Sequence, residues 1–394
     1  MWMIKRFLLY TARFLMRAVY SVIKLFPVKN TIVFISRQSN EPGFDFVCLN
    51  EQLKKDFPEY RIVYLCKKLG KKPIDYFKYS FHMLKQMYYL STSRVAVLDS
   101  YCIAASVLKH KKSLKIIQIW HALGLMKKFA YSAIGNREGG GADVAQIMRL
   151  HRNYYKIICS SSALKSEFAK AYDTDEKNII GLGLPRLDFL TNKQQMLQKK
   201  QQIFGLYPEL DNGKQTIVYV PTFRKYTVNG YQKFVSAVDK KKFNLVVKFH
   251  GGKEYVYIGS NRLARKSGLM GMEFLSVADY VVSDYSAIIF EAIAADKPLY
   301  LYCFDIDEYK QARGLFIDYQ SIPAIISKSA KTIYLDILHH KVKTDGIKEF
   351  KRIYLPNTNI NITKALTYLI GSTAKGIQIS ENQLLTDSRF KKTN

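Results

Sequence analysis

The chain contains two consecutive series of short apolar segments, and each series is interrupted by longer stretches with helical spacing. In the first series, the segments rich in valine, isoleucine and tyrosine are 31–36, 61–66, 95–98, 116–120, 157–160 and 179–182. The second series starts near residue 214 and contains the segments 216–220, 245–249, 280–283 and 299–302. Runs of this length and composition, separated by helical patterns, are typical of parallel strands buried between helices in an α/β fold.

Two successive α/β series predict two Rossmann-like domains that face each other across a cleft. One long doubly wound sheet is the alternative, and the restart near residue 214 favours two domains. The length of 394 residues also suits two domains. We expect an N-terminal domain over 27–205 and a C-terminal domain over 206–372. Residues 373–394 are polar and basic, and we expect them to form a poorly ordered tail.

Residues 1–26 precede both series and have the pattern of an amphipathic helix. Arg6, Arg13, Arg17 and Lys24 fall within a sector about 40° wide, and the other faces are apolar. A spanning helix should not hold Arg13 and Arg17 near its middle, and a signal peptide requires an uninterrupted apolar segment. We therefore expect a helix that lies on an anionic membrane surface. The alternative is an ordinary amphipathic helix packed on the protein's own body.

The whole chain is strongly basic, with 61 Lys and Arg residues against 32 Asp and Glu residues and a formal net charge of +29. This charge indicates an anionic partner such as lipid headgroups, nucleotides or a phosphate-rich polymer, although a lysine-rich solvated surface would also account for it. No nucleic-acid-binding motif is present, so we expect no nucleic acid partner.

The five cysteines are widely scattered and include no CxxC pair. They are typical of small core residues in a reducing compartment, which indicates the cytoplasm. Neither histidines at zinc spacing nor a clear acidic cluster is present, so we expect no metal ion and no cofactor.

Polar residues directly follow four of the predicted strands. His121 follows the strand 116–120, and Lys127 and Lys128 come shortly after it. The other three strand ends carry Pro221-Thr222-Phe223-Arg224, His250-Gly251-Gly252 and Asp284-Tyr285-Ser286. Ligands of open α/β sheets collect at the carboxyl ends of the strands, which favours a phosphate-handling cleft here. Each residue also has a structural interpretation, since Asp-Tyr-Ser caps a helix with or without a phosphate.

Several of these segments resemble the CDP-glycerol glycerophosphotransferase family, the teichoic acid primases and polymerases. The most specific resemblance is residues 278–319, ADYVVSDYSAIIFEAIAADKPLYLYCFDIDEYKQARGLFIDY. Upstream, the segments IQIWHALGLMKKF, GLGLPRLD, YVPTFR and KFH follow in the family's order. Ala122, Gly251, Ser283 and Ala287 replace residues that are usual in the family, whereas both histidines and Asp284, Tyr285 and Ser286 are retained.

The resemblance implies a GT-B fold in which the C-terminal domain holds a CDP-activated donor. It implies two catalytic histidines: His121 as the general base for the acceptor hydroxyl, and His250 as a residue that stabilises the leaving phosphate. The residues implied around the donor diphosphate and nucleotide are Thr222, Arg224, Ser283, Asp284, Tyr285 and Ser286. Contacts with the acceptor or the polyol are expected at Lys127, Lys128, Arg186, Asp188 and Arg313.

The implied reaction moves glycerol phosphate, or a related polyol phosphate, from CDP-glycerol or CDP-ribitol to a polyprenyl-linked acceptor of the teichoic acid or capsule type, with release of CMP. The enzyme would be a peripheral protein on the cytoplasmic face of the cell membrane. One alternative is a GT-B glycosyltransferase that uses a nucleotide sugar, because a fold does not determine a function. The other is a basic module that binds membranes or nucleic acid without catalysis. The sequence indicates no oligomeric state.

Overall fold

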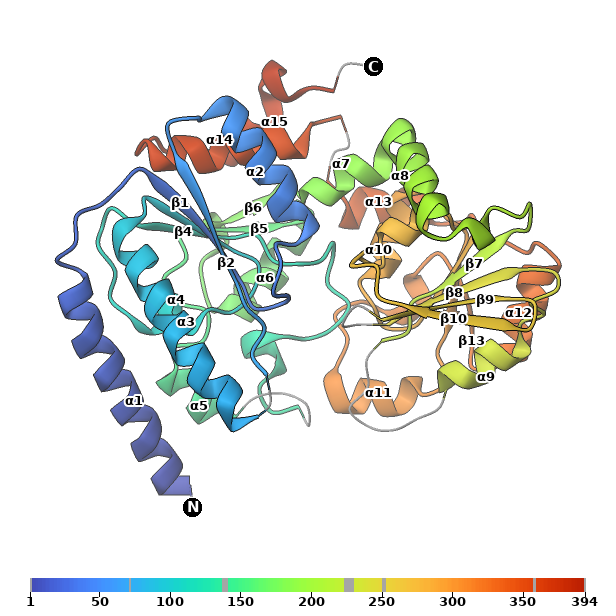
Figure 1. The fold of residues 1–394 in the computed structure, drawn as a ribbon, viewed down its shortest axis with the longest axis horizontal. Helices are drawn as coiled ribbons and strands as arrows, with labels where there is room; N and C mark the ends of the chain where they lie inside the picture. Colours follow the sequence, from blue (N-terminus) through green and yellow to red (C-terminus); the bar gives the residue numbers. More distant parts are fainter. Residues whose placement is uncertain are drawn as a thin grey trace. The chain divides into compact units, whose positions relative to one another are not determined.

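The computed structural model describes residues 2–70, 72–136, 141–222, 230–249, 253–356 and 359–392, which form two compact α/β units (Figure 1). The first unit comprises Met1–His121, Lys128–Arg186 and Pro356–Asn394, and the second comprises Ala122–Lys127 and Leu187–Leu355. The expected α/β units with parallel sheets and the expected N-terminal helix are confirmed. The sequence-based boundaries follow the linear order of the strands, whereas contacts return residues 356–394 to the first unit.

The first unit is built on six parallel strands in the order β2-β1-β3-β4-β5-β6. The strands are β1 (Thr31–Ser36), β2 (Arg61–Cys66), β3 (Val95–Leu98), β4 (Lys115–Gln118), β5 (Lys156–Cys159) and β6 (Ile179–Gly181). The helices between them are α2 (Phe44–Asp56), α3 (Pro73–Thr92), α4 (Ile103–Val107), α5 (Ala142–Ile147) and α6 (Lys165–Tyr172). The strand order reverses between β1 and β3, and loops at such a reversal diverge to leave a crevice.

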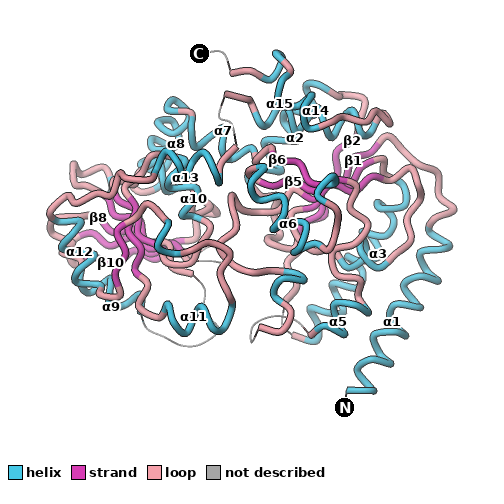
Figure 2. Tube along the Cα trace, turned by 180° about the vertical axis from the view of Figure 1, so that it is seen from behind, coloured by secondary structure: helices cyan, strands magenta, loops and turns pink. Residues whose placement is uncertain are grey.

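The second unit has seven strands in the order β10-β9-β8-β7-β11-β12-β13. They are β7 (Thr216–Tyr219), β8 (Asn244–Lys248), β9 (Glu254–Ile258), β10 (Asn261–Arg265), β11 (Tyr280–Ser283), β12 (Leu299–Tyr302) and β13 (Ile325–Ser327). The helices are α7 (Pro185–Thr191), which begins at the end of the first unit, and α8 (Lys193–Leu206), α9 (Gly230–Ala237), α10 (Ile288–Ala294), α11 (Ile306–Arg313), α12 (Ala330–Leu338) and α13 (Ile347–Tyr354). Strands and helices of each unit can be followed from behind in Figure 2. The antiparallel pair β9 and β10 was not expected from the sequence.

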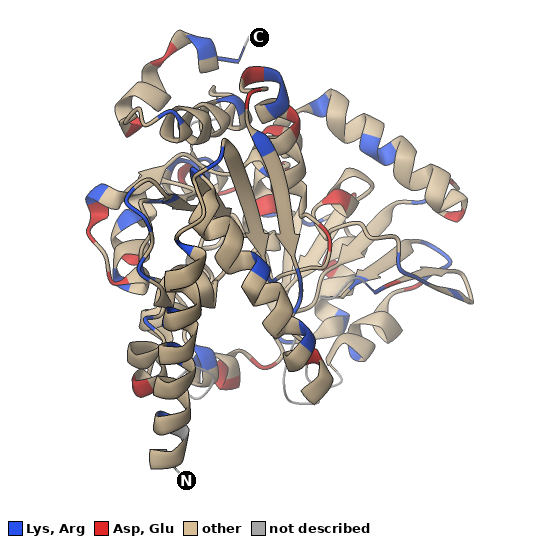
Figure 3. Ribbon diagram, turned by 60° about the vertical axis from the view of Figure 1, so that its left-hand side comes forward, with Lys and Arg blue, Asp and Glu red and all other residues tan. Residues whose placement is uncertain are grey.

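The N-terminal helix α1 (Trp2–Ile23) packs against α3 and α5 of the first unit. Its inner face holds the buried Met16 and Tyr20, and a guanidinium N–H of Arg13 donates to the carbonyl of Ile147 at 3.0 Å. The basic sector therefore borders the packed face of the helix: Arg6, Arg13 and Lys24 are partly buried, and Arg17 is exposed. The outer face is apolar and exposed, and the α1 ribbon carries few charged positions in Figure 3.

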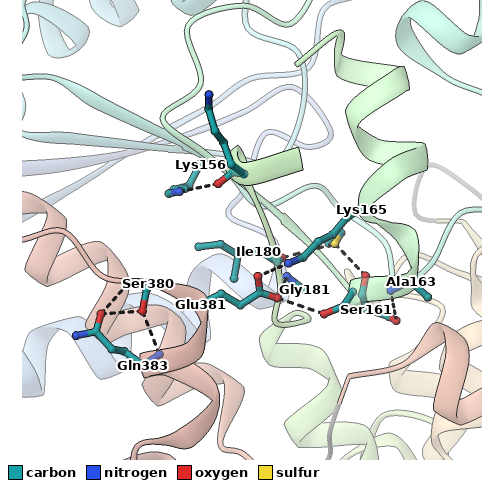
Figure 4. A network of polar contacts seen from close by, with 12 residues as sticks. Lys156, Ser161, Ala163, Lys165, Ile180, Gly181, Ser380, Glu381 and Gln383 are labelled. Carbon is teal, nitrogen blue, oxygen red and sulfur yellow. Dashed lines mark hydrogen bonds and ion pairs between the residues drawn. The ribbon is translucent and has the colours of Figure 1, made fainter. Parts of the chain in front are cut away.

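The C-terminal segment folds onto the first unit through α14 (Ile362–Ala374) and α15 (Glu381–Thr386). The carboxylate of Glu381 accepts hydrogen bonds from the Gly181 N–H at 3.0 Å and from the Ser162 hydroxyl at 3.2 Å, and it forms an ion pair with Lys165 (Figure 4). The expectation of a poorly ordered tail was wrong for the described part of this segment. The segment forms α15, and its apolar side chains Leu384 and Phe390 are buried against the protein.

Candidate active site

His121 follows β4 at the carboxyl edge of the first sheet. Its Nδ1 lies 2.9 Å from the backbone carbonyl oxygen of Asp99, which follows the neighbouring strand β3. A carbonyl oxygen only accepts hydrogen bonds, so Nδ1 carries the proton and Nε2 has the lone pair in the neutral ring. The side chain is partly exposed, which leaves it accessible to a substrate.

The residue before His121 has a strained backbone. Trp120 adopts a φ of 62°, a left-handed conformation that is rare for a bulky side chain. Its N–H donates to the side-chain oxygen of Gln118 at 3.0 Å, and its ring lies 4.1 Å from the ring of His121 and 4.3 Å from that of Phe129. These contacts hold the turn between β4 and His121.

A buried carboxylate lies beside this turn, at the reversal of strand order. Asp99 is 8% exposed, and its Oδ2 accepts a hydrogen bond from the hydroxyl of Ser36, at the end of β1, at 2.7 Å. Its Oδ1 has no hydrogen-bond partner in the described part of the chain. Burial raises the pKa of Asp99 to about 6, and the bond from Ser36 counteracts only part of this effect.

The second unit places another aspartate at its own reversal of strand order, between β7 and β11. Both carboxylate oxygens of the buried Asp284 accept from the N–H of Thr222, at 2.9 and 3.2 Å, and Oδ1 also accepts from the N–H of Tyr285 at 2.7 Å. The hydroxyl of Ser283, also buried, donates to the carbonyl of Val220 at 2.8 Å. These two side chains fix the loop that leaves β7.

Aromatic side chains support the same edge of the second unit. Tyr285 is buried, stacks on Tyr309 with 4.0 Å between ring centroids, and donates its hydroxyl to Asp305 at 2.9 Å. The ammonium of Lys127 lies 5.6 Å from the centre of the Tyr309 ring, and the backbone of Lys127 pairs with that of Leu315. The segment after His121 therefore belongs to the wall of the second unit.

The sequence profile of the CDP-glycerol:poly(glycerophosphate) glycerophosphotransferase family matches residues 18–353. The chain belongs to this family. A teichoic acid ribitol-phosphate primase of Bacillus spizizenii is 29% identical over 88% of the chain and 92% of the relative. A teichoic acid poly(ribitol-phosphate) polymerase of the same organism is 27% identical over 84% of the chain, and the chain spans about half (54%) of that relative.

The fold of this glycerophosphotransferase family member is similar to that of a solved relative. The wall teichoic acid polymerase TagF, in a structure of a histidine variant with CDPG, superposes with a TM-score of 0.69 at 20% identity, over 95% of this chain and 98% of that chain. The resemblance identified from the sequence, and the class of enzyme that it implied, are confirmed by the family match.

Two of the residues expected around the transferase site prove to be tied into the fold. Arg186 is 4% exposed, and its guanidinium donates to Oδ2 of Asp45 through Nε at 3.0 Å and Nη2 at 2.5 Å. The Arg186 N–H donates to Oδ1 of Asp45 at 2.9 Å. This geometry favours a role for Arg186 in joining α7 to α2 over a direct contact with the acceptor. Ser283 is equally enclosed.

The remaining predicted positions are more open. Ser286, Lys128, Asp188 and Arg313 are partly exposed, and Arg313 is the last residue of α11. Ser286 accepts a long hydrogen bond of 3.4 Å from the Ile288 N–H, which leaves its hydroxyl hydrogen able to donate elsewhere. Arg224 and His250 lie outside the described residues. In the sequence they follow β7 and β8, which are adjacent parallel strands.

Sequence reasoning did not select Asp99, whose carbonyl contacts His121, or Ser36, which donates to Asp99. Asp99 directly follows the predicted strand 95–98, so its position at a strand end was visible in the sequence. Identifying Asp99 as a neighbour of Ser36 also requires the order of the strands, because only that order places β3 beside β1. Across the described residues, no three His, Cys, Asp or Glu side chains are grouped so that they could hold a metal ion.

Proposed function

We propose that this chain transfers glycerol phosphate or ribitol phosphate from a CDP-linked donor to a hydroxyl of a lipid-linked teichoic acid or capsule-type acceptor, on the cytoplasmic face of the membrane. The observation that carries this proposal is the orientation of His121, together with membership of the glycerophosphotransferase family. In the reaction, the acceptor oxygen bonds to the phosphorus that carries the polyol. The bond from that phosphorus to the CMP oxygen breaks, and CMP leaves.

His121 is the proposed general base. With Nδ1–H donating to the Asp99 carbonyl, Nε2 is the atom that takes the proton from the acceptor hydroxyl as the new P–O bond forms. This role requires the neutral form of the imidazole, in which Nε2 can accept a proton. The hydrogen bond also fixes the direction of the ring, so less entropy is lost in orienting the imidazole when the substrate binds.

The donor site is proposed at the carboxyl edge of β7, β8 and β11 in the second unit. Asp284 and Ser283 hold the loop that contains Thr222 and leads to Arg224, and His250 follows the adjacent strand β8. Arg224 and His250 supply the positive and hydrogen-bonding groups for the diphosphate, and Ser286 adds a hydroxyl donor. Asp284, Ser283 and Tyr285 act as positioning residues, since all three are buried.

Lys127 and Lys128 are proposed to guide the anionic acceptor toward His121. Both side chains are partly exposed, and Lys127 is held over the ring of Tyr309. Asp188 and Arg313 are proposed as further polyol or acceptor contacts, because both are partly exposed. An array of fixed cations raises the local concentration of a polyphosphate chain.

Membrane association is proposed through the outer face of α1 and the neighbouring half of α3. Exposed apolar side chains are concentrated there, for example Phe7 and Phe14 at 70% and Phe77 at 62% exposure. Patches of this kind on a soluble surface mark interaction sites, and an in-plane helix buries such a face at the lipid boundary. Within the described chain, no helix has the combination of length and hydropathy that a membrane crossing requires.

The test measures CMP release from CDP-glycerol and from CDP-ribitol with a lipid-linked acceptor. His121→Ala should lower turnover by roughly 10²–10⁴-fold and leave the calorimetric affinity for the donor nearly unchanged. The matched control is His339→Ala, an exposed histidine after α12, which should behave as wild type. His121→Ala activity within a few-fold of wild type would remove His121 from the mechanism. Nucleotide release from a sugar donor alone would overturn the proposed reaction.

A further inference from the structure

A large cavity lies between α1 and the amino-terminal edge of the first sheet, away from His121. Its volume is about 970 Å³, within the range of ~300–1,000 Å³ that is common for ligand pockets. β4 begins at this edge with Lys115 and ends at the opposite edge, three residues before His121. The cavity is therefore a separate site from the proposed catalytic centre.

Six cationic side chains line this cavity, and the described residues include no aspartate or glutamate in its wall. The cations are Arg17, Lys24, Lys109, Lys112, Lys115 and Arg149. They come from α1 and the residue that follows it, the loop before β4, the start of β4 and the segment after α5. The rest of the wall contains the polar residues Ser21, His110 and Asn153 together with tyrosine, leucine and isoleucine side chains, so the lining mixes cationic, neutral polar and apolar groups.

None of the six cations has an ion-pair partner among the residues that the structure describes. Elsewhere in the first unit, Lys165, Lys170, Lys177 and Arg152 each have an acidic partner, whereas these six cations are gathered around one cavity without one among the described residues. Clustered like charges repel one another, and a bound anion would remove that cost.

The protonation states of neighbouring groups are consistent with a concentrated positive field. Burial lowers the pKa of Arg13, and the charges of Arg17 and Arg149 lower it further. Burial also lowers the pKa of His110 to about 4, with Lys24 and Arg149 contributing in the same direction. His110 is thus neutral: its Nε2–H donates to the Ala105 carbonyl at 2.8 Å, and its Nδ1 accepts from the Tyr20 hydroxyl at 2.7 Å.

The position of the cavity relative to α1 indicates the origin of the anion. The outer face of α1 is apolar and exposed, and the cavity lies on its inner face. A helix with its side chains is about 10 Å across, and an interfacial helix sinks about 5–10 Å into the boundary between headgroups and acyl chains. When the outer face contacts acyl chains, the inner face is therefore at the depth of the phosphate groups.

We propose that the cavity between α1 and the amino-terminal edge of β4 and β5 binds the phosphate headgroup of an anionic membrane lipid. This inference rests on the proposed membrane association and extends it from a general surface attraction to a defined site. The shared chemistry is a phosphate ester on a lipid chain, which is found both in bilayer phospholipids and in prenyl diphosphate carriers. The site would hold the first unit at a fixed height and orientation on the leaflet.

The test is calorimetric titration of the full chain, without CDP donor, using monomeric dihexanoyl phosphatidylglycerol, dihexanoyl phosphatidylcholine and geranyl diphosphate. Wild type should bind an anionic probe saturably at one site per chain, and it should not bind the phosphatidylcholine. The variant Arg17→Gln/Lys112→Gln/Arg149→Gln should lose about 100-fold in affinity, from about fivefold for each of the three charges near the bound anion.

Two further variants separate a built site from general charge. Lys54→Gln/Lys55→Gln/Arg61→Gln removes the same charge from exposed positions of the same unit and should bind as wild type. Arg17→Lys/Arg149→Lys keeps the charge and should retain most of the affinity. The glutamine variant should keep the melting temperature of wild type, which separates a loss of binding from a folding defect.

Each outcome has a defined meaning. Saturable binding of phosphatidylglycerol assigns the site to bilayer lipid, and binding of geranyl diphosphate alone assigns it to a prenyl-linked lipid. Equal losses in the cavity and surface variants, or no saturable binding of either anion, would overturn the inference. Because the titration contains no donor, its failure would leave CMP release untouched. Loss of transferase activity in the His121 test would likewise leave the cavity result standing.

Discussion

Two aspartates hold equivalent positions in the two units. Asp99 follows β3 beside β1, and Asp284 follows β11 beside β7, so each lies where the strand order reverses. Each carboxylate binds the end of the first strand of its sheet or the loop after it, through Ser36 in one unit and Thr222 in the other. Crevices at such reversals bind ligands in open α/β sheets. We infer that both carboxylates preorganise binding loops, with the Asp99 carbonyl also orienting His121.

The pKa of Asp99 predicts a pH dependence of stability. Burial raises this pKa from its ordinary 3.8 to about 6. Between about pH 4 and pH 6 the folded chain keeps a proton that the unfolded chain has released, so stability falls as pH rises through this window and stays lower above it. The effect is on the order of 3 kcal/mol.

Asp99→Asn should remove this dependence, because the amide does not titrate. Thermal denaturation of wild type and variant should give a melting-temperature difference that changes between about pH 4 and pH 6.5 and is constant above that range. The control is Asp175→Asn, which makes the same substitution at an exposed aspartate. A constant difference over the whole range would show that Asp99 ionises normally in the folded chain.

The helices α1 and α15, near the two ends of the chain, both pack on the first unit. α1 contributes Met16 and Tyr20 to the same core cluster as the strand residues Val33 and Leu98, so the helix is part of the fold as well as a candidate membrane contact. At the other end, α15 presents Glu381 to the edge strand β6 and to the turn after β5. Gly181 must be glycine there, because a Cβ atom would lie 2.5 Å from the Ser162 nitrogen.

Glu381→Ala should destabilise the first unit. The change leaves the N–H of the buried Gly181 without this acceptor and removes the partner of Lys165, which should cost about 1–3 kcal/mol. A fall of several degrees in melting temperature is expected, with faster amide exchange at β6. Glu176→Ala removes one exposed carboxylate of the same unit and should change neither quantity. Equal behaviour of both variants would mean that α15 does not stabilise β6.

The whole molecule combines a net charge of +29 with an exposed apolar face on one unit. These two properties respond differently to ionic strength. Electrostatic attraction to an anionic bilayer is screened over about 10 Å at 0.1 M salt and about 3 Å at 1 M, whereas apolar insertion is not screened. Their contributions to membrane binding are therefore separable by experiment.

Binding to phosphatidylglycerol vesicles should fall by at least about tenfold between about 0.05 and 0.5 M salt, measured by sedimentation. The binding that remains should depend on Phe7 and Phe14, since each phenyl ring buried in lipid contributes about 1.5–3 kcal/mol. Phe7→Ser/Phe14→Ser should therefore lower it about tenfold or more. Leu197→Ser/Leu206→Ser changes two exposed apolar residues of α8 and should have no effect. Equal losses in both pairs would argue against α1 as the membrane contact.

The positions of the buried parallel strands were readable from the sequence because such strands are continuous runs of β-branched residues. Segments 31–36, 61–66, 95–98, 280–283 and 299–302 agree with the structure to the residue, and 116–120 differs only at its ends. The pair β9 and β10 was not readable, because β10 is mostly exposed and carries no apolar run. β10 pairs with β9, and β9 pairs with β8, so the two strands extend the edge of the sheet as antiparallel hairpins.

In the candidate site, too, some features were predictable from the sequence and others depended on the tertiary structure. Sequence alone determined that His121 and Asp284 follow strands, and it determined that the cations of residues 1–26 share one face. It did not determine which way that face is turned, because helical periodicity is the same whether a face meets lipid or protein. Tertiary packing turned it toward Lys112, Lys115 and Arg149. It also enclosed Arg186 with Asp45 and brought Asp99 beside Ser36, since only the order of the strands decides which loops become neighbours.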